Sequence, residues 1–178
     1  MKLLRTIRLD PSDTFVFEPA AEPGEWAVPG GFAFFDVNPA TLEGKAKAAF
    51  RSGFLGLASL GWSTLAQIVD ATEADRLAAT DLLAKQLVER FGAPDLEAAR
   101  AAAADELAFA TSLAEQPVDT LVAMHRTCDE DGIRETFRAL RRRENADQFR
   151  AFTFLEVEGE EAHDEGDVVD LAKLSRQP

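Results

Sequence analysis

Residues 118–143 read VDTLVAMHRTCDEDGIRETFRALRRR, and this stretch carries the most informative run of structural signals in the chain. Its apolar run 121–124 has the length and the bounded character of a strand buried on both faces. Asp129 fits the N-cap of a helix whose first turn would hold two further acidic residues. Three apolar residues then recur at helical spacing: Ile133, Phe137 and Leu140. The stretch therefore predicts a strand over 118–125, a polar turn, and a helix over 130–142.

The same pattern occurs once more upstream. Residues 63–84, STLAQIVDATEADRLAATDLLA, align without gaps to residues 119–140. The matching positions include Thr64 with Thr120, Leu65 with Leu121, and Asp75 with Asp131. A solenoid needs at least three such units to bury a core, and only two are seen. We interpret the two segments as similar strand–helix units of one fold, with a true internal repeat as the open alternative.

The remaining signals predict strands in the first third of the chain and helices after it. Helices are predicted over 40–51, 73–91 and 95–115, where apolar residues recur at helical spacing. Strands are predicted over 2–9, 14–17, 26–28, 32–37, 62–69 and 151–157, with a hairpin turn at Pro29-Gly30-Gly31. Residues 52–61 are predicted to form a further strand that makes a hairpin with 62–69, with an irregular loop as the open alternative. These elements favour an α+β fold, with a mixed, mostly antiparallel sheet covered by helices on one face. The predicted sheet unites 62–69, 118–125 and 151–157.

The composition predicts one globular domain followed by an acidic tail. The chain has 178 residues, is 46% hydrophobic and 29% charged, and has a net charge of -13. Residues 156–170 contain eight acidic residues and no Lys or Arg. We therefore expect a domain over 1–157 and a flexible tail over 158–178. An acidic domain does not attract phosphate backbones, so nucleic acid is not an expected partner.

The location of the protein is predicted from its cysteine content and its apolar runs. The single cysteine, Cys128, cannot form a disulfide within the chain. No signal peptide is recognisable at the start, and no apolar run approaches the length of a membrane span. We therefore expect a cytoplasmic protein without membrane contact.

His125 and Cys128 form the one cluster that resembles a chemical site. Three residues apart, an imidazole and a thiolate can share a zinc ion, or can act as a base and a nucleophile. A zinc site needs at least three protein ligands, however, and no second ligand pair follows. A strand-end histidine and a small thiol before a helix explain the pair more simply. We accordingly expect neither a metal nor a cofactor, and name no catalytic residue beyond these two candidates.

Arginines concentrate after this pair. Residues 134–150 hold six Arg against three acidic residues, in a chain that is otherwise acidic. On a helix held to the core by its apolar stripe, four of these side chains would face outward: Arg134, Arg138, Arg141 and Arg142. Such a face is often only solvated, but arginine is also the residue favoured for recognising carboxylates. We predict that it binds a protein partner, with self-association through the acidic tail as a variant.

The chain resembles an uncharacterised family of small bacterial proteins. The resemblance rests on RTIRLDPSDTFVFEPAAEPGEWAVPGGFAFF, residues 5–35, and on TLVAMHRTCDEDGIRETFRAL, residues 120–140. It implies no activity, cofactor or catalytic residue. Together with the residue patterns, it favours a non-catalytic binding or accessory protein that acts through a protein partner. The alternative is a small-molecule enzyme or metal site that uses His125 and Cys128.

Overall fold

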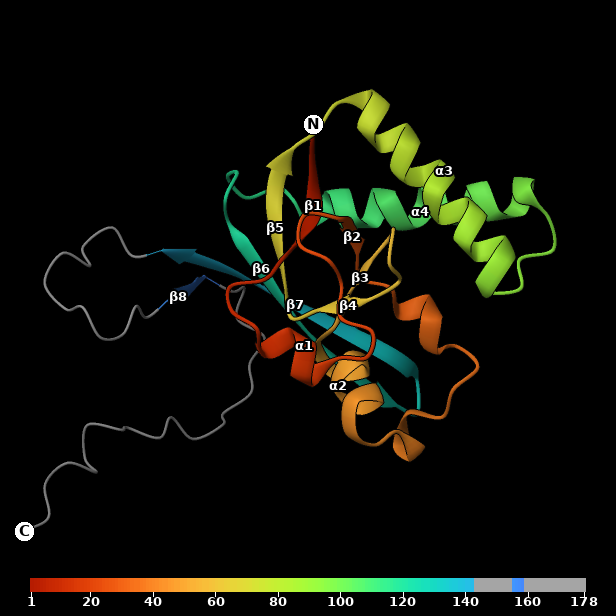
Figure 1. The fold of residues 1–178 in the computed structure, drawn as a ribbon, viewed down its shortest axis with the longest axis horizontal. Helices are drawn as coiled ribbons and strands as arrows, with labels where there is room; N and C mark the ends of the chain where they lie inside the picture. Colours follow the sequence, from red (N-terminus) through yellow and green to blue (C-terminus); the bar gives the residue numbers. More distant parts are fainter. Residues whose placement is uncertain (143–154, 159–178) are drawn as a thin grey trace, which may run out of the picture.

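The protein is an α+β domain built on one antiparallel sheet (Figure 1). The computed structural model describes residues 1–142 and 155–158, and the side chains up to residue 141. The strands described are β1 Lys2–Ile7, β2 Trp26–Val28, β3 Phe54–Gly56, β4 Trp62–Ser63, β5 Leu65–Asp70, β6 Leu121–Asp129, β7 Gly132–Arg142 and β8 Leu155–Glu158. Their order is β4-β3-β2-β1-β5-β6-β7-β8, and neighbours run antiparallel. The predicted α+β class and largely antiparallel sheet are confirmed.

Four α-helices accompany the sheet in the described residues. They are α1 Ser12–Val16, α2 Gly44–Ser52, α3 Glu73–Arg90 and α4 Leu96–Ser112, with short 3-10 helices η1 Gly31–Phe34 and η2 Pro39–Thr41. The α3 helix begins with a capping box, in which Thr72 and Asp75 satisfy each other's backbone N–H groups. Asp95 caps α4 by accepting a hydrogen bond from the backbone of Ala98. The predicted helices 40–51, 73–91 and 95–115 are therefore confirmed, apart from their ends.

The helices α2 and α4 cover the same face of the sheet. Arg126 on β6 lies directly opposite Glu135 on β7, and its guanidinium reaches the carbonyl of Phe50 in α2. Phe137, two residues beyond Glu135 on the same side of β7, makes an edge-to-face contact with Phe109 of α4. The covering of one face by helices is confirmed for these two elements.

The α3 and α4 helices pack against each other (Figure 1). Ala79 and Ala84 of α3 and Ala99 and Ala103 of α4 are fully buried. Small side chains let two helix backbones approach closely. Ala99 and Ala103 are therefore part of the core, together with the larger Leu107.

The predicted helix over 130–142 is wrong, because this segment is strand β7. It pairs with β6 over most of its length, from Asp129 opposite Gly132 to Leu121 opposite Leu140. Gly132 has a φ of +115°, a conformation that glycine adopts without the steric cost of a side chain. The hairpin places a strand where the upstream segment has α3, so the two proposed strand–helix units do not match.

Two shorter strand predictions are also wrong. Residues 14–17 lie mostly in α1, and residues 32–37 begin in η1 rather than pairing with β2. The β2 strand lies between β1 and β3, so both of its hydrogen-bonding edges are already taken. The predicted hairpin of β3 and β4 is confirmed.

The predicted sheet of 62–69, 118–125 and 151–157 is confirmed where the structure describes it, in β5, β6 and β8. Residues 151–154 of the last predicted strand, and all but the first residue of the predicted tail 158–178, lie outside the described residues. Within the described part of the chain, no helix is both long enough and apolar enough to cross a membrane.

Candidate functional site

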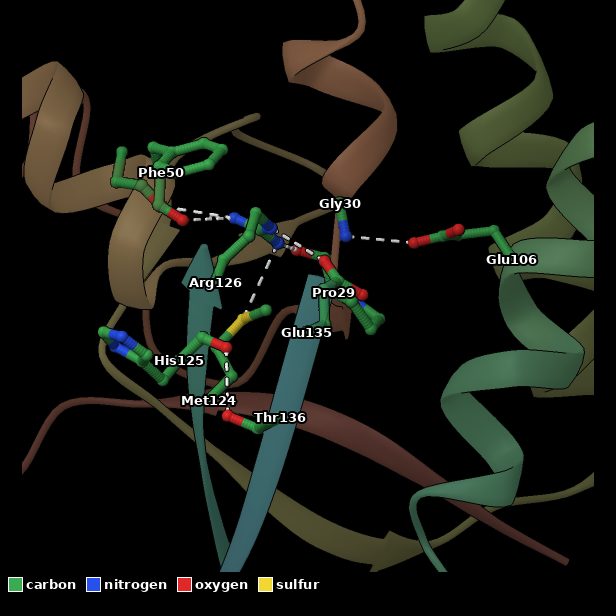
Figure 2. A network of polar contacts seen from close by, with 10 residues as sticks. Pro29, Gly30, Phe50, Glu106, Met124, His125, Arg126, Glu135 and Thr136 are labelled. Carbon is green, nitrogen blue, oxygen red and sulfur yellow. Dashed lines mark hydrogen bonds and ion pairs between the residues drawn. The ribbon is translucent and has the colours of Figure 1, made fainter. Parts of the chain in front are cut away.

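Arg126 is the least exposed of the polar residues that the structure describes, at 1%. Figure 2 shows it reaching from β6 toward α2 and the turn at Pro29. Its Nε donates to Glu135 Oε1 at 2.7 Å, and its Nη1 and Nη2 donate to the carbonyls of Phe50 and Pro29, each at 2.7 Å. The guanidinium also lies 5.3 Å from the ring centre of Phe34. A buried charge tolerates this environment only because it is paired and hydrogen-bonded.

This network joins segments that are distant in the sequence. Arg126 links β6 to a carbonyl 76 residues away in α2 and to another 97 residues away beside η1. Burial lowers the pKa of Arg126, and the charge of Glu135 opposes that shift. Arginine nevertheless stays charged in proteins. The network therefore has a structural role: it fixes how α2 and η1 sit against the sheet.

Glu106 of α4 is a half-buried ionisable group near this network. Its Oε1 accepts a hydrogen bond from the backbone N–H of Gly30 at 2.9 Å (Figure 2). Burial raises the pKa of Glu106. The Gly30 bond opposes that shift, while the negative charge of Glu135 adds to it. Two carboxylates near a single buried guanidinium leave the cluster with an excess of negative charge.

We expect the free energy of unfolding of a Glu106→Gln variant to depend less on pH than that of the wild type. The folded wild type holds the Glu106 proton to a higher pH than the unfolded chain does. Its free energy of unfolding therefore falls as pH rises from the usual glutamate pKa through the raised one. Glutamine can still accept the Gly30 bond but carries no charge. Urea unfolding should show the two proteins converging below this window and the variant more stable above it. If the wild type is the more stable of the two proteins above this pH window, the raised pKa of Glu106 is contradicted.

His125 and Cys128 are both exposed and lie three residues apart on β6. His125 pairs with Thr136 and Cys128 with Ile133, and residues three apart in a strand point to opposite faces. Within the described residues no hydrogen bond joins the two side chains, and the Cys128 thiol contacts the carbonyl of Asp129 at 3.8 Å. No group of three or more His, Cys, Asp or Glu residues in the described part of the chain could hold a metal ion.

Both residues nevertheless line one cleft of about 410 Å³ between α2, η2 and the end of β6. Its lining also includes two basic residues of α2, Lys47 and Arg51. The structure thus brings His125 and Cys128 to the same cleft through strand pairing, without bringing them into the contact that joint catalysis needs.

The four predicted arginines do not share one face. Arg134 and Arg138 are exposed and lie on the face of β7 opposite to Glu135 and Phe137. We call these two residues the arginine row. Arg141 has the opposite strand parity and donates a hydrogen bond to the side chain of Gln116. The side chain of Arg142 lies outside the described residues.

A recess of about 370 Å³ adjoins the arginine row. It is lined by Ala123, Met124, His125, Thr136 and Arg138. Arg134 forms an exposed ion pair with Asp129 at 3.0 Å, whereas Arg138 makes no ion pair with any described residue. The face opposite to the buried network therefore presents a cation beside a recess.

Sequence reasoning missed Arg126, Glu135 and Glu106, and the basic residues of the cleft. One available signal was that Ile133 and Phe137 are separated by an even number of positions and flanked by polar residues, which also fits one face of a strand. Another was the Asp131-Gly132 dipeptide, a recognised hairpin signal. Applied to 121–142, these two signals predict a hairpin and place Arg126 and Glu135 on its covered face.

Comparison with known families gives one match. The model of a family of unknown function, DUF6505, matches residues 1–156. The chain belongs to this family. No curated protein and no solved structure shows significant similarity to it. The DUF6505 match spans β1 to β7 and the start of β8, so it includes the buried network and the arginine row.

Proposed function

We propose that this protein is a non-catalytic binding or accessory protein of the cytoplasm, and that an acidic protein partner docks on the arginine row. One observation carries the proposal: Arg138 is exposed beside a recess and makes no ion pair with any described residue. In a chain with 32 acidic and 19 basic residues, acidic partners for an arginine are plentiful. A cation kept apart from them is available to another molecule.

The chemistry of the row favours carboxylates as its ligands. A guanidinium presents a planar fork of donors that matches a carboxylate, and it is less strongly hydrated than an ammonium group. The surrounding protein carries a net negative charge, so it repels an acidic partner elsewhere. This contrast orients the partner and makes binding weaken as salt screens the charges.

The strand setting supports a rigid docking surface. The row lies on β7, which is paired with β6 on one side and with β8 on the other. Phe137, between the two arginines in sequence, faces the covered side and contacts Phe54 and Phe109. Charge reversal in the row should therefore leave the core intact.

We expect the double variant Arg134→Glu/Arg138→Glu to lose the partner while it keeps the fold. The matched control is Arg90→Glu/Arg100→Glu. Arg100 forms an exposed ion pair with Asp81 at 2.9 Å, as Arg134 does with Asp129. Arg90 is exposed and makes no ion pair with any described residue, as Arg138 does. The measurement is affinity capture from native-host extract at low and moderate salt, with thermal unfolding of each variant.

The proposal requires a protein that the wild type and the control capture and the row variant does not. The row variant should change the free energy of unfolding by no more than about 0.5 kcal/mol, as surface substitutions usually do. If the captured protein is the chain itself, the row mediates self-association. Equal capture by all three proteins, or no capture at either salt, would refute the docking site.

A further inference from the structure

A second surface adjoins the recess beside the arginine row, with which it shares His125, and has the composition of a small-molecule site. It is the cleft of about 410 Å³ described above, a volume within the usual range of ligand pockets. Three elements form it: η2 with the preceding Asn38, one side of α2, and the end of β6. Its polar lining includes Asn38, Lys47, Arg51, His125, Cys128 and the buried Arg126.

The charge of the cleft is opposite to that of the chain. Among the residues that line it none is acidic, although acidic residues outnumber basic ones by 32 to 19 in the sequence. Lys47 and Arg51 are exposed and make no ion pair with any described residue. They lie one helical turn apart on α2, where like charges repel each other slightly. An anion between them would convert this repulsion into attraction.

We propose that the cleft binds a small organic anion through a carboxylate or phosphate group held by Lys47 and Arg51. Asn38 is positioned to add a neutral donor. Its Oδ1 accepts a hydrogen bond from the backbone N–H of Ala40 at 3.0 Å, so its amide NH₂ remains available. Pro39 and Ala40 supply apolar surface for the organic part of the ligand. Binding here requires no chemistry by His125 or Cys128, and it uses neither arginine of the row.

Arg51 also has a role within its own helix that needs no ligand. Arg51 lies in the last turn of α2, where a cation interacts favourably with the helix dipole. Arg90 lies in the last turn of α3 and is likewise exposed, but it does not line the cleft. Arg90→Gln therefore removes an equivalent helix-end cation and serves as the control for Lys47→Gln/Arg51→Gln.

The first measurement is a titration of the full-length chain, followed by NMR chemical shifts of the backbone amides. The probes are inorganic phosphate and succinate, with glycerol as the uncharged control, all at constant ionic strength. We expect saturable shifts that concentrate at residues 38–40, 47–51 and 125–128. The double variant should bind at least about tenfold more weakly, because hydrogen bonds to charged groups are lost. The Arg90→Gln protein should match the wild type. The probe that binds more tightly shows whether the cleft prefers a phosphate or a carboxylate group.

The second measurement uses Cys128, the only cysteine of the chain, as a reporter of occupancy. Phosphate or succinate should slow its alkylation by iodoacetamide, a neutral reagent, in the wild type and in Arg90→Gln. The same probe concentrations should give no protection in Lys47→Gln/Arg51→Gln. Absence of saturable shifts with both anions, or equal affinity in the double variant and the wild type, would overturn the proposal.

Discussion

An Arg126→Met variant is expected to unfold about 3–5 kcal/mol more readily than the wild type, the cost typical of removing one partner of a buried ion pair. Arg126 is 1% exposed, and methionine fills similar space without any of its donors. Glu135 would keep its charge in the covered layer without its partner at 2.7 Å. The carbonyls of Pro29 and Phe50 would each lose a hydrogen bond. Urea unfolding measures the change directly.

The double variant Arg126→Met/Glu135→Gln separates the two parts of this cost. If the unpaired carboxylate dominates, adding Glu135→Gln should recover a substantial fraction of the stability lost in the single variant. If the carbonyls of Pro29 and Phe50 dominate, the second substitution should recover little. A single variant within about 0.5 kcal/mol of the wild type, the range of surface substitutions, would show that the network does not hold the elements together.

A Phe54→Ala variant is expected to lose about 3–5 kcal/mol, the usual cost of deleting a buried aromatic ring. Phe54 on β3 is fully buried, and its ring centre lies 6.3 Å from that of Phe137 on β7. The substitution leaves a cavity beneath the strand that carries the arginine row. Phe35→Ala is the matched control, because Phe35 is 75% exposed and should change stability by no more than about 0.5 kcal/mol. Similar losses in the two variants would contradict the described packing.

Local signals were enough to predict the helices α3 and α4. Thr72 with Asp75 forms a capping box, and Asp95 caps the second helix, so the start of each helix is encoded within four residues. Gly92 has a φ of +74° just beyond the end of α3, a conformation favoured by glycine at helix ends. Where start and stop signals are local, sequence reasoning identifies the element.

The β7 strand shows why local signals fail elsewhere. Ile133, Phe137 and Leu140 fit a helical stripe, yet Ile133 and Phe137 equally fit the period of a strand. Arginine is also a good helix former, so the residue propensities of this segment do not oppose a helix. Pairing with β6 over residues 132–140 decides between the two, and such pairing is a tertiary interaction that no short window contains.

The candidate sites depend even more on distant contacts. Arg126 became the centre of the buried network only because its strand lies against Pro29 and Phe50, which precede it by 97 and 76 residues. Lys47 and Arg51 likewise line the same cleft as His125 only because α2 packs on β6. Spacing along the chain could identify His125 with Cys128 as neighbours, but it could not show which surface they share.

The central claim, that an acidic partner docks on the arginine row, is tested most directly by photo-crosslinking from within the row. Thr136 is exposed between Arg134 and Arg138 on the same face, and Glu89 on α3 offers an exposed control position. A benzophenone amino acid at residue 136, expressed in the native host, should yield one covalent adduct with an acidic protein. The Arg134→Glu/Arg138→Glu background should abolish that adduct, and residue 89 should give none. No adduct from residue 136, or the same adduct from residue 89, would contradict the claim.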